Sequence, residues 1–330
     1  MNRIMVAREP VTPIVEPIDV APASEIALEP SGQASIEGKT EAPWQRVSRD
    51  FLANPLAIAG AVILTLLMLA ALFAETLAPT NPYDLTKLDL MDALQVPGSR
   101  NMDGSVTFLL GTDGQGRDML SAMLYGLRTS ILVGVMSGVI ALGLGTMVGI
   151  VAAYFGGWAD SVVMRIVDLQ LSFPSILVAM VLLAVLGQGV DKIILALVIV
   201  QWAYYARTVR SAALVERSKE YVEAALCLGI GKGPVMFRHM MRNCLPPLIV
   251  VATVQVGSAI SLEATLSFLG LGLPVTKPSL GLLISNGFAF LMSGKYWISL
   301  YPGVLLLVTI VAINLVGDHL RDILNPRLKH

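Results

Sequence analysis

Apolar runs long enough to cross a bilayer recur along this chain, and they constrain its fold more than any other feature. A membrane-spanning helix needs about 20 predominantly apolar residues, and residues 55–76 form the first such run. Hydrophobic residues make up 55% of the 330 residues and charged residues only 14%, too few to cover a water-soluble domain. Backbone groups in lipid must be satisfied internally, which favours helices. We therefore predict an all-α polytopic membrane protein.

Six spans are predicted. The third of them ends near residue 186, and Pro174 is expected either to kink it or to stand at its start, because proline removes a helix hydrogen bond. The other spans cover about 55–76, 127–155, 192–206, 245–271 and 298–316.

The distribution of apolar and polar residues divides the chain into three predicted regions. Residues 1–43 contain six prolines and no apolar run, so we predict a disordered tail, with a tethering or regulatory role as the alternative. Residues 44–125 are assigned to the first span and a polar external segment, and residues 126–330 to a five-helix core.

Basic residues predict the orientation. The stretch 207–243, between the fourth and fifth spans, is rich in lysine and arginine, namely Arg207, Arg210, Arg217, Lys219, Lys232, Arg238 and Arg242. Loops that are rich in lysine and arginine stay in the cytoplasm. This rule places the 207–243 loop and both termini in the cytoplasm, and the segment after the first span outside.

The cytoplasmic loop has the pattern of two short helices. Residues 217–228 contain neither glycine nor proline, Gly229 is placed as a helix stop, and Pro234 suits a helix start. Ala224 and Ala225 leave a shallow face beside the charge of Glu223, which suits insertion into a groove of another protein. The alternative is an amphipathic helix that rests on lipid headgroups.

Small and polar residues within the spans mark further candidates. Glycines four residues apart allow close helix packing, and the second span has two such pairs, Gly134 with Gly138 and Gly145 with Gly149. Polar residues inside a membrane are functional candidates, so Gln255 and Glu263 are assigned to a translocation path. The alternative for Glu263 is a bond to a neighbouring helix or subunit. Asp168 and Arg165 are expected to form a structural ion pair.

Several classes of site are not supported. No Walker A loop is present, because Gly231-Lys232 is followed by Gly233 instead of serine or threonine. The three histidines and two cysteines lack the paired spacing of a metal site, and no nucleophile–base pair can be assembled. We expect no catalytic residue, no metal, no cofactor bound by this chain and no nucleic-acid partner.

The segment Glu223-Ala-Ala-x-x-x-Gly229 resembles the cytoplasmic "EAA" signature of ABC importer permeases, which docks into the ATPase subunits. The family pattern continues with Ile-x-Leu-Pro, whereas His239, Met241 and Arg242 stand here. The resemblance implies a type I importer fold and an ATPase-coupling interface, which we assign to Glu220, Glu223, Ala224, Ala225, Gly229 and Gly231.

A second resemblance narrows the group. The run Leu110-Gly-Thr-Asp-Gly-Gln-Gly-Arg-Asp118 is similar to the segment before the core in dipeptide, oligopeptide and nickel permeases of the "C" type. The segments 156–160, 266–272 and 317–327 also match that pattern, while Ala122 and Leu280 replace the arginine and tryptophan that are common there.

This resemblance implies one permease of a heterodimer, with a second related permease, two ATPases that carry ATP and magnesium, and a periplasmic or lipid-anchored binding protein. The expected solutes are di- and oligopeptides, with nickel chelates or glutathione as alternatives. A different class, a secondary transporter that works without an ATPase, requires an ion site or inverted repeat that the sequence does not display.

Overall fold

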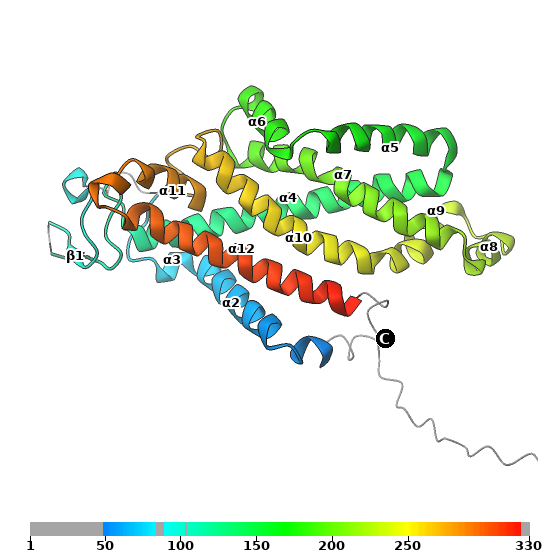
Figure 1. Ribbon diagram of the computed structural model, residues 1–330, viewed down its shortest axis with the longest axis horizontal. Coiled ribbons are helices and arrows are strands. Elements are labelled where there is room, and N and C mark those ends of the chain that lie inside the picture. The colour runs from blue at the N-terminus through cyan, green and yellow to red at the C-terminus, as the bar shows by residue number, and fades with distance from the viewer. Residues whose placement is uncertain (1–48, 84–88, 103, 325–330) are drawn as a thin grey trace, which may run out of the picture. The chain divides into compact units, whose positions relative to one another are not determined.

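The computed structural model describes residues 49–83, 89–102 and 104–324, which belong to one compact unit, 43–330. The predicted tail, 1–43, lies outside the described residues. Five helices are long and apolar enough to cross a membrane, and a bent helix pair brings the candidate spans to as many as six. The described chain is thus a helical bundle whose long helices lie side by side (Figure 1).

The bundle begins with α2 (Pro55–Leu72), followed by the short α3 (Ala74–Leu77) and later by the long α4 (Met119–Phe155). The Asn54 side chain caps α2 and Pro55 is its first residue, a favourable start because proline has no N–H to leave unpaired. Asp118 caps α4 by accepting from the Ser121 amide. α4 therefore starts well before the predicted position 127, and residue 126 lies inside it.

The third span is broken as the sequence suggests. α5 (Gly157–Ser172) and α6 (Ser175–Leu186) meet at an angle of 92°. Pro174 is the residue directly before α6, so it begins this helix. The residue before a proline avoids the helical conformation, which explains why α5 ends there.

The cytoplasmic loop predicted at 207–243 is mostly helix, which corrects that prediction. α7 (Val190–Arg217) continues three turns past residue 206, and a short α8 (Glu220–Cys227) follows. From Lys232 onward α9 (Lys232–Pro234), the π-helical η3 (Val235–Met240) and α10 (Met241–Phe268) form one 37-residue stretch. The second short helix expected after Gly229 is therefore the first part of this long helical stretch. Pro234 does not interrupt the stretch, because it lies in its first turn, where proline is tolerated.

The glycines of α4 lie where other helices approach it. A Cβ added at Gly134 would lie 2.4 Å from the Ile260 side chain of α10. One added at Gly138 would lie 3.1 Å from Val256, also on α10. The second pair faces α7. A Cβ at Gly145 would lie 2.4 Å from the Trp202 carbonyl oxygen, and one at Gly149 would lie 2.4 Å from the Ala206 carbonyl oxygen.

A polar segment and short elements close one end of the bundle. They comprise a two-stranded antiparallel sheet of β1 (Ser99–Arg100) and β2 (Thr107–Phe108), the 3-10 turns η2 (Leu90–Asp92) and η4 (Leu291–Ser293), and the helix α11 (Leu280–Phe288). The last helix, α12 (Trp297–Leu324), starts at this end and packs against α2, α10 and α11 (Figure 1).

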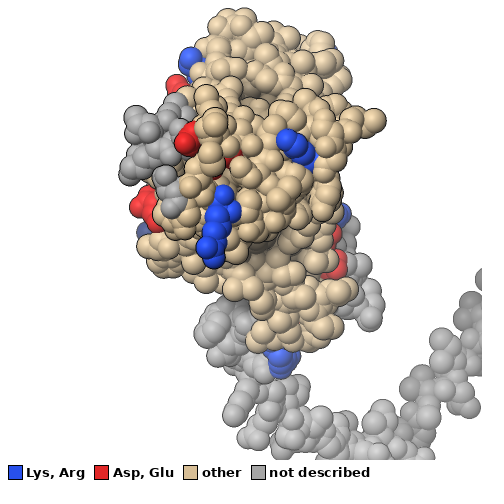
Figure 2. Space-filling view, turned by 90° about the vertical axis from the view of Figure 1, so that its left-hand side faces the viewer, with Lys and Arg blue, Asp and Glu red and all other residues tan. Residues whose placement is uncertain are grey.

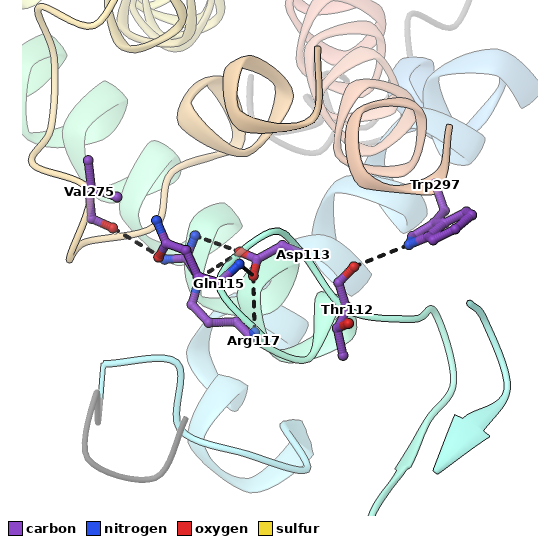
Figure 3. A network of polar contacts seen from close by, with 6 residues as sticks. All are labelled: Thr112, Asp113, Gln115, Arg117, Val275 and Trp297. Carbon is purple, nitrogen blue, oxygen red and sulfur yellow. Dashed lines mark hydrogen bonds and ion pairs between the residues drawn. The ribbon is translucent and has the colours of Figure 1, made fainter. Parts of the chain in front are cut away.

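A buried ion pair holds this end together. Arg117 and Asp113 are 0% and 1% exposed, and the Arg117 Nη2 atom lies 2.7 Å from the Asp113 Oδ2 atom. Arg117 Nη1 also donates to the Val275 carbonyl at 3.2 Å, and the Trp297 indole donates to the Thr112 carbonyl at 3.2 Å (Figure 3). The segment 112–117 is thereby bonded both to the loop after α10 and to the start of α12.

Candidate coupling segment and translocation cavity

α8 lies at the end of the bundle opposite to β1 and α11, beyond the long helices (Figure 1). The connection Ser218–Lys219 separates it from α7, and residues 228–231 lead from it to the next long helix. The helix that was predicted to run from 217 to 228 is thus interrupted. This break allows α8 to leave the direction of α7.

α8 divides into a buried face and an exposed face. Val222 and Ala225 are 2% and 6% exposed and pack into a core formed with α4, α7 and α10. Residues three apart share a helix face, so Ala225 points inward, which departs from its expected place on the partner-facing surface. Glu220, Glu223 and Ala224 are exposed.

Two exposed leucines extend the outer face. Leu226 is 46% exposed and Leu228 is 80% exposed. The sequence analysis did not single them out, and helical spacing gave no signal, because Leu226 lies four residues after Val222 and Leu228 three residues after Ala225, spacings that normally share a face. Apolar surface exposed beside polar groups marks sites of contact with a protein or a membrane, so this face is available to a partner.

Gly229 ends α8 in a regular capping motif. Its φ of +73° is in the left-handed region, which favours glycine. The Ile230 amide donates to the Ala225 carbonyl at 3.1 Å, and the Gly229 amide donates to the Leu226 carbonyl at 3.0 Å. These two bonds define a Schellman motif, so the predicted helix stop at Gly229 is confirmed. Gly231 is exposed and is the residue before Lys232.

Two substitutions at Gly229 are expected to distinguish the cost of backbone strain from the cost of losing the hydrogen bond of the Gly229 amide. An added Cβ would meet nothing within 4 Å, so Gly229→Ala should cost only the left-handed conformation, about 1 kcal/mol. Gly229→Pro should cost more, because proline cannot adopt a positive φ and has no amide to donate to Leu226. Limited proteolysis at 228–231 would measure both, with Gly233→Ala as control. Equal cleavage rates for the proline and alanine variants would contradict this account.

A cavity with several polar side chains in its lining lies between α6, α7, α10 and α12. Its volume is about 590 Å³, and its described lining is uncharged. Gln255 lines it, as does Asn314, and Gln201 donates to the Gln255 carbonyl at 3.1 Å. The other polar groups are Ser175, Tyr204, Ser258, Ser261 and Thr265. The lining thus combines neutral hydrogen-bonding groups with apolar side chains such as Ile176, Val200 and Leu262.

A second cavity of about 730 Å³ continues the first. It shares Tyr204 and Gln255 with it, and it extends past Pro246 and Pro247 to Arg321 near the end of α12. The two cavities together form a groove along α7 and α10 whose lining is partly polar and partly apolar. Gln201 and Asn314 escaped the sequence analysis because isolated polar residues in a span carry no information about which face is hollow.

Glu263 does not line this groove. It is 0% exposed and accepts hydrogen bonds from Ser130 of α4 at 2.8 Å and from Ser267 at 2.7 Å. The Ser130 hydroxyl in turn accepts from the Leu280 amide at 3.4 Å. These contacts match the alternative considered for Glu263, a bond to a neighbouring helix, and they join α4, α10 and α11.

Ion pairs fasten α5 to α7. Arg210 donates to both carboxylate oxygens of Asp160 at 2.6 Å. Asp168 pairs with Arg207, so the expected pair of Asp168 with Arg165 is wrong. The reason is that α5 lies alongside α7, which brings an arginine of another helix to the carboxylate.

The remaining ionisable groups do not suggest a metal site. Within the ranges that the structure describes, no three histidine, cysteine, aspartate or glutamate side chains are grouped to hold a metal ion. Cys244 is fully buried in the apolar core beneath α8, and Cys227 is exposed.

Comparisons with known proteins agree along most of the chain. A family model described as "Binding-protein-dependent transport system inner membrane component" matches residues 145–330. A second, described as "N-terminal TM domain of oligopeptide transport permease C", matches residues 42–97. The dipeptide transport system permease protein DppC of Escherichia coli K12 is 40% identical over 287 residues, 87% of this chain and 94% of that protein.

Another relative and one solved structure extend the comparison. The di/tripeptide transport system permease protein DppC of Pseudomonas aeruginosa UCBPP-PA14 is 37% identical over 288 residues, 87% of this chain and 93% of that protein. An inward-facing structure of the MetNI methionine ABC transporter superimposes with a TM-score of 0.51 at 19% identity, covering 63% of this chain and 98% of that one. At that identity the likeness concerns the fold alone.

The apolar helices, the family matches and the relatives lead to one conclusion. The chain is a multi-pass inner membrane protein and a transport subunit. It belongs to the binding-protein-dependent transport system inner membrane components, and within them to the DppC/OppC-like permeases of ABC importers.

Proposed function

We propose that this chain is one permease subunit of an ATP-driven importer for di- or oligopeptides. The observation that carries the proposal is the exposed outer face of α8, which displays Glu223 beside Leu226 and Leu228 at one end of a bundle of this family. Relatives named as dipeptide permeases, 36–40% identical over about nine-tenths of their own length, support the peptide substrate.

The proposed topology has six spans with both termini in the cytoplasm, counting the bent pair α5–α6 as one span. The positive-inside rule supports this orientation, because the α8 end of the bundle carries Arg210, Arg217, Lys219 and Lys232. β1, α11 and the buried Arg117–Asp113 pair then lie on the external side.

Two ATPases are the proposed cytoplasmic partners. A groove on each ATPase subunit would receive a coupling helix from one permease, here α8, with the leucines buried in it and Glu220 and Glu223 at its rim. ATP and magnesium would bind to those subunits and not to this chain, which has no Walker A sequence.

A second, related permease and an external binding protein complete the proposed complex. The groove along α7 and α10 is not fully enclosed by this chain, and the second permease would close it into a translocation path. The external end offers exposed apolar side chains, such as Leu90, Leu109 and Met292, among scattered charges, a surface suited to a docking protein (Figure 2).

Transport would follow from movement at α8. Closure of the ATPase pair would displace α8, which is joined through two residues to α7 and through four residues to the stretch that ends in α10. Because α7 and α10 both line the groove, their movement would open it to one side of the membrane and close it to the other. The chain would thus perform alternating access, while ATP hydrolysis takes place on the partners.

Charge reversal on α8 tests the proposal. In proteoliposomes that hold the full complex, Glu223→Arg is expected to lower ATPase co-purification and dipeptide uptake by at least about tenfold, because an interface charge is reversed. Asp322→Arg, the same change at an exposed position of α12, should leave both unchanged. Uptake that persists in vesicles without any ATPase would refute the importer function and favour a secondary transporter.

A further inference from the structure

One carboxylate joins three helices where α8 meets the bundle. Glu216, in the last turn of α7, is 7% exposed. Its Oε2 atom accepts a hydrogen bond from the Tyr221 hydroxyl at 2.6 Å and from the Asn243 side-chain amide at 2.9 Å. Tyr221 belongs to α8 and Asn243 to α10. A single side chain of α7 therefore bonds both other helices.

Further bonds close this cluster. Lys219, in the connection between α7 and α8, pairs with the other carboxylate oxygen of Glu216. The Asn243 amide also donates to the Tyr221 hydroxyl oxygen at 3.1 Å. Burial, and then the bond to Glu216, raise the pKa of Tyr221 to about 12, so its hydroxyl stays protonated and remains a donor to the carboxylate.

The bonded turn of α10 lies between two interruptions of that helix. Before it runs the π-helical segment Val235–Met240. After it come Pro246 and Pro247, which have no N–H, so the carbonyls of Arg242 and Asn243 lose their helix bonds. Helices bend at such positions. The part of α10 that Glu216 holds is thus a short segment that can change its angle to the rest of the helix.

Apolar packing alone does not fix this joint. Val222 and Ala225 anchor α8 in the core, but burial of apolar surface is non-directional and tolerates rotation. Charge-assisted hydrogen bonds are stronger and depend on geometry. The Glu216 cluster therefore adds directional bonds between α8, α7 and α10 to this apolar packing.

We propose that Glu216 is a positioning residue that makes α7 and the turn of α10 before Pro246 move together with α8. This inference rests on the proposed docking of α8 onto an ATPase. Without the carboxylate, α8 still docks and ATP is still hydrolysed, but its displacement reaches the groove-lining helices incompletely. The measurable consequence is a loss of solute moved per ATP hydrolysed.

The test uses the full complex, with both permeases, the ATPases and the binding protein, in proteoliposomes. Uptake of radiolabelled glycyl-leucine and ATP turnover are measured together, and assembly is measured by co-purification. Glu216→Ala is expected to lower uptake per ATP by about tenfold and Tyr221→Phe by about threefold, as expected for loss of hydrogen bonds to a charged group. Glu216→Gln, which keeps an acceptor oxygen, should recover most of the loss.

The control is Ser218→Ala, in the same connection between α7 and α8. The exposed Ser218 hydroxyl donates to the Val215 carbonyl of its own turn. Uptake per ATP hydrolysed should therefore equal that of the wild type. A wild-type ratio for both Glu216→Ala and Tyr221→Phe overturns the inference. If Glu216→Ala does not assemble, Tyr221→Phe alone decides, since a lowered ratio supports coupling and an unchanged one refutes it. If the wild-type permeases take up glycyl-leucine without the ATPases, the proposed function is refuted, and not only this inference.

Discussion

Replacing Gly149 with alanine is expected to destabilise the folded chain by about 1–3 kcal/mol, the range for overpacking a tight core. An added Cβ at Gly149 would lie 2.4 Å from the carbonyl oxygen of Ala206 and 3.0 Å from its Cα atom. Both atoms belong to the backbone of α7, so no side-chain rotation relieves the overlap and the two helices must separate. Thermal unfolding of the purified chain in detergent measures the effect, and Gly149→Leu should leave little folded protein.

Gly143→Ala provides the matched control on the same helix. A Cβ there would meet nothing within 4 Å, and glycine is a weaker helix former than alanine by about 1 kcal/mol. This substitution should therefore leave stability unchanged or raise it slightly. If Gly143→Ala destabilised the chain as much as Gly149→Ala, the close approach of α4 and α7 would not be the cause.

Replacing Arg117 with methionine is expected to destabilise the end of the bundle that holds β1 and α11 by about 3–5 kcal/mol, because one partner of a buried ion pair is left without its counter-charge. Asp113 is 1% exposed, so water cannot replace the guanidinium. The bond from Arg117 to the Val275 carbonyl is lost as well. The change should appear as a lowered unfolding temperature and as faster proteolysis of the 94–118 segment.

The exposed pair of Arg128 and Glu75 serves as the comparison. Its side chains are 42% and 69% exposed, and pairs of this kind contribute only about 0–1 kcal/mol. Arg128→Met should therefore be nearly silent in the same assay. A double substitution, Arg117→Met with Asp113→Leu, should recover part of the loss, because it removes the unpaired buried charge; no recovery would argue against the electrostatic explanation.

Much of the helical framework could be predicted from local sequence. Apolar length located the membrane helices, and Pro174 and Gly229 marked a helix start and a helix end. These features depend on properties of a few neighbouring residues, such as the missing N–H of proline and the ease with which glycine adopts a positive φ.

The lengths and faces of the helices were less predictable. α7 and α10 extend well beyond their apolar runs into the stretch 207–243, because a helix continues into water as long as its polar residues remain helix-forming and tertiary contacts hold them. Ala225 faced inward although its neighbour Ala224 faced outward, a distinction that only the rotation of α8 against the core decides.

The sequence by itself determined the membrane class, the family resemblance and the site of the candidate coupling segment, because hydrophobic length, charge distribution and short motifs are properties of contiguous residues. Only the tertiary structure decided which polar residues meet. Glu216 bonds Asn243, Asp168 pairs with Arg207, and Arg117 reaches Val275. These partners lie far apart in the chain, and their pairing depends on how the helices are packed together.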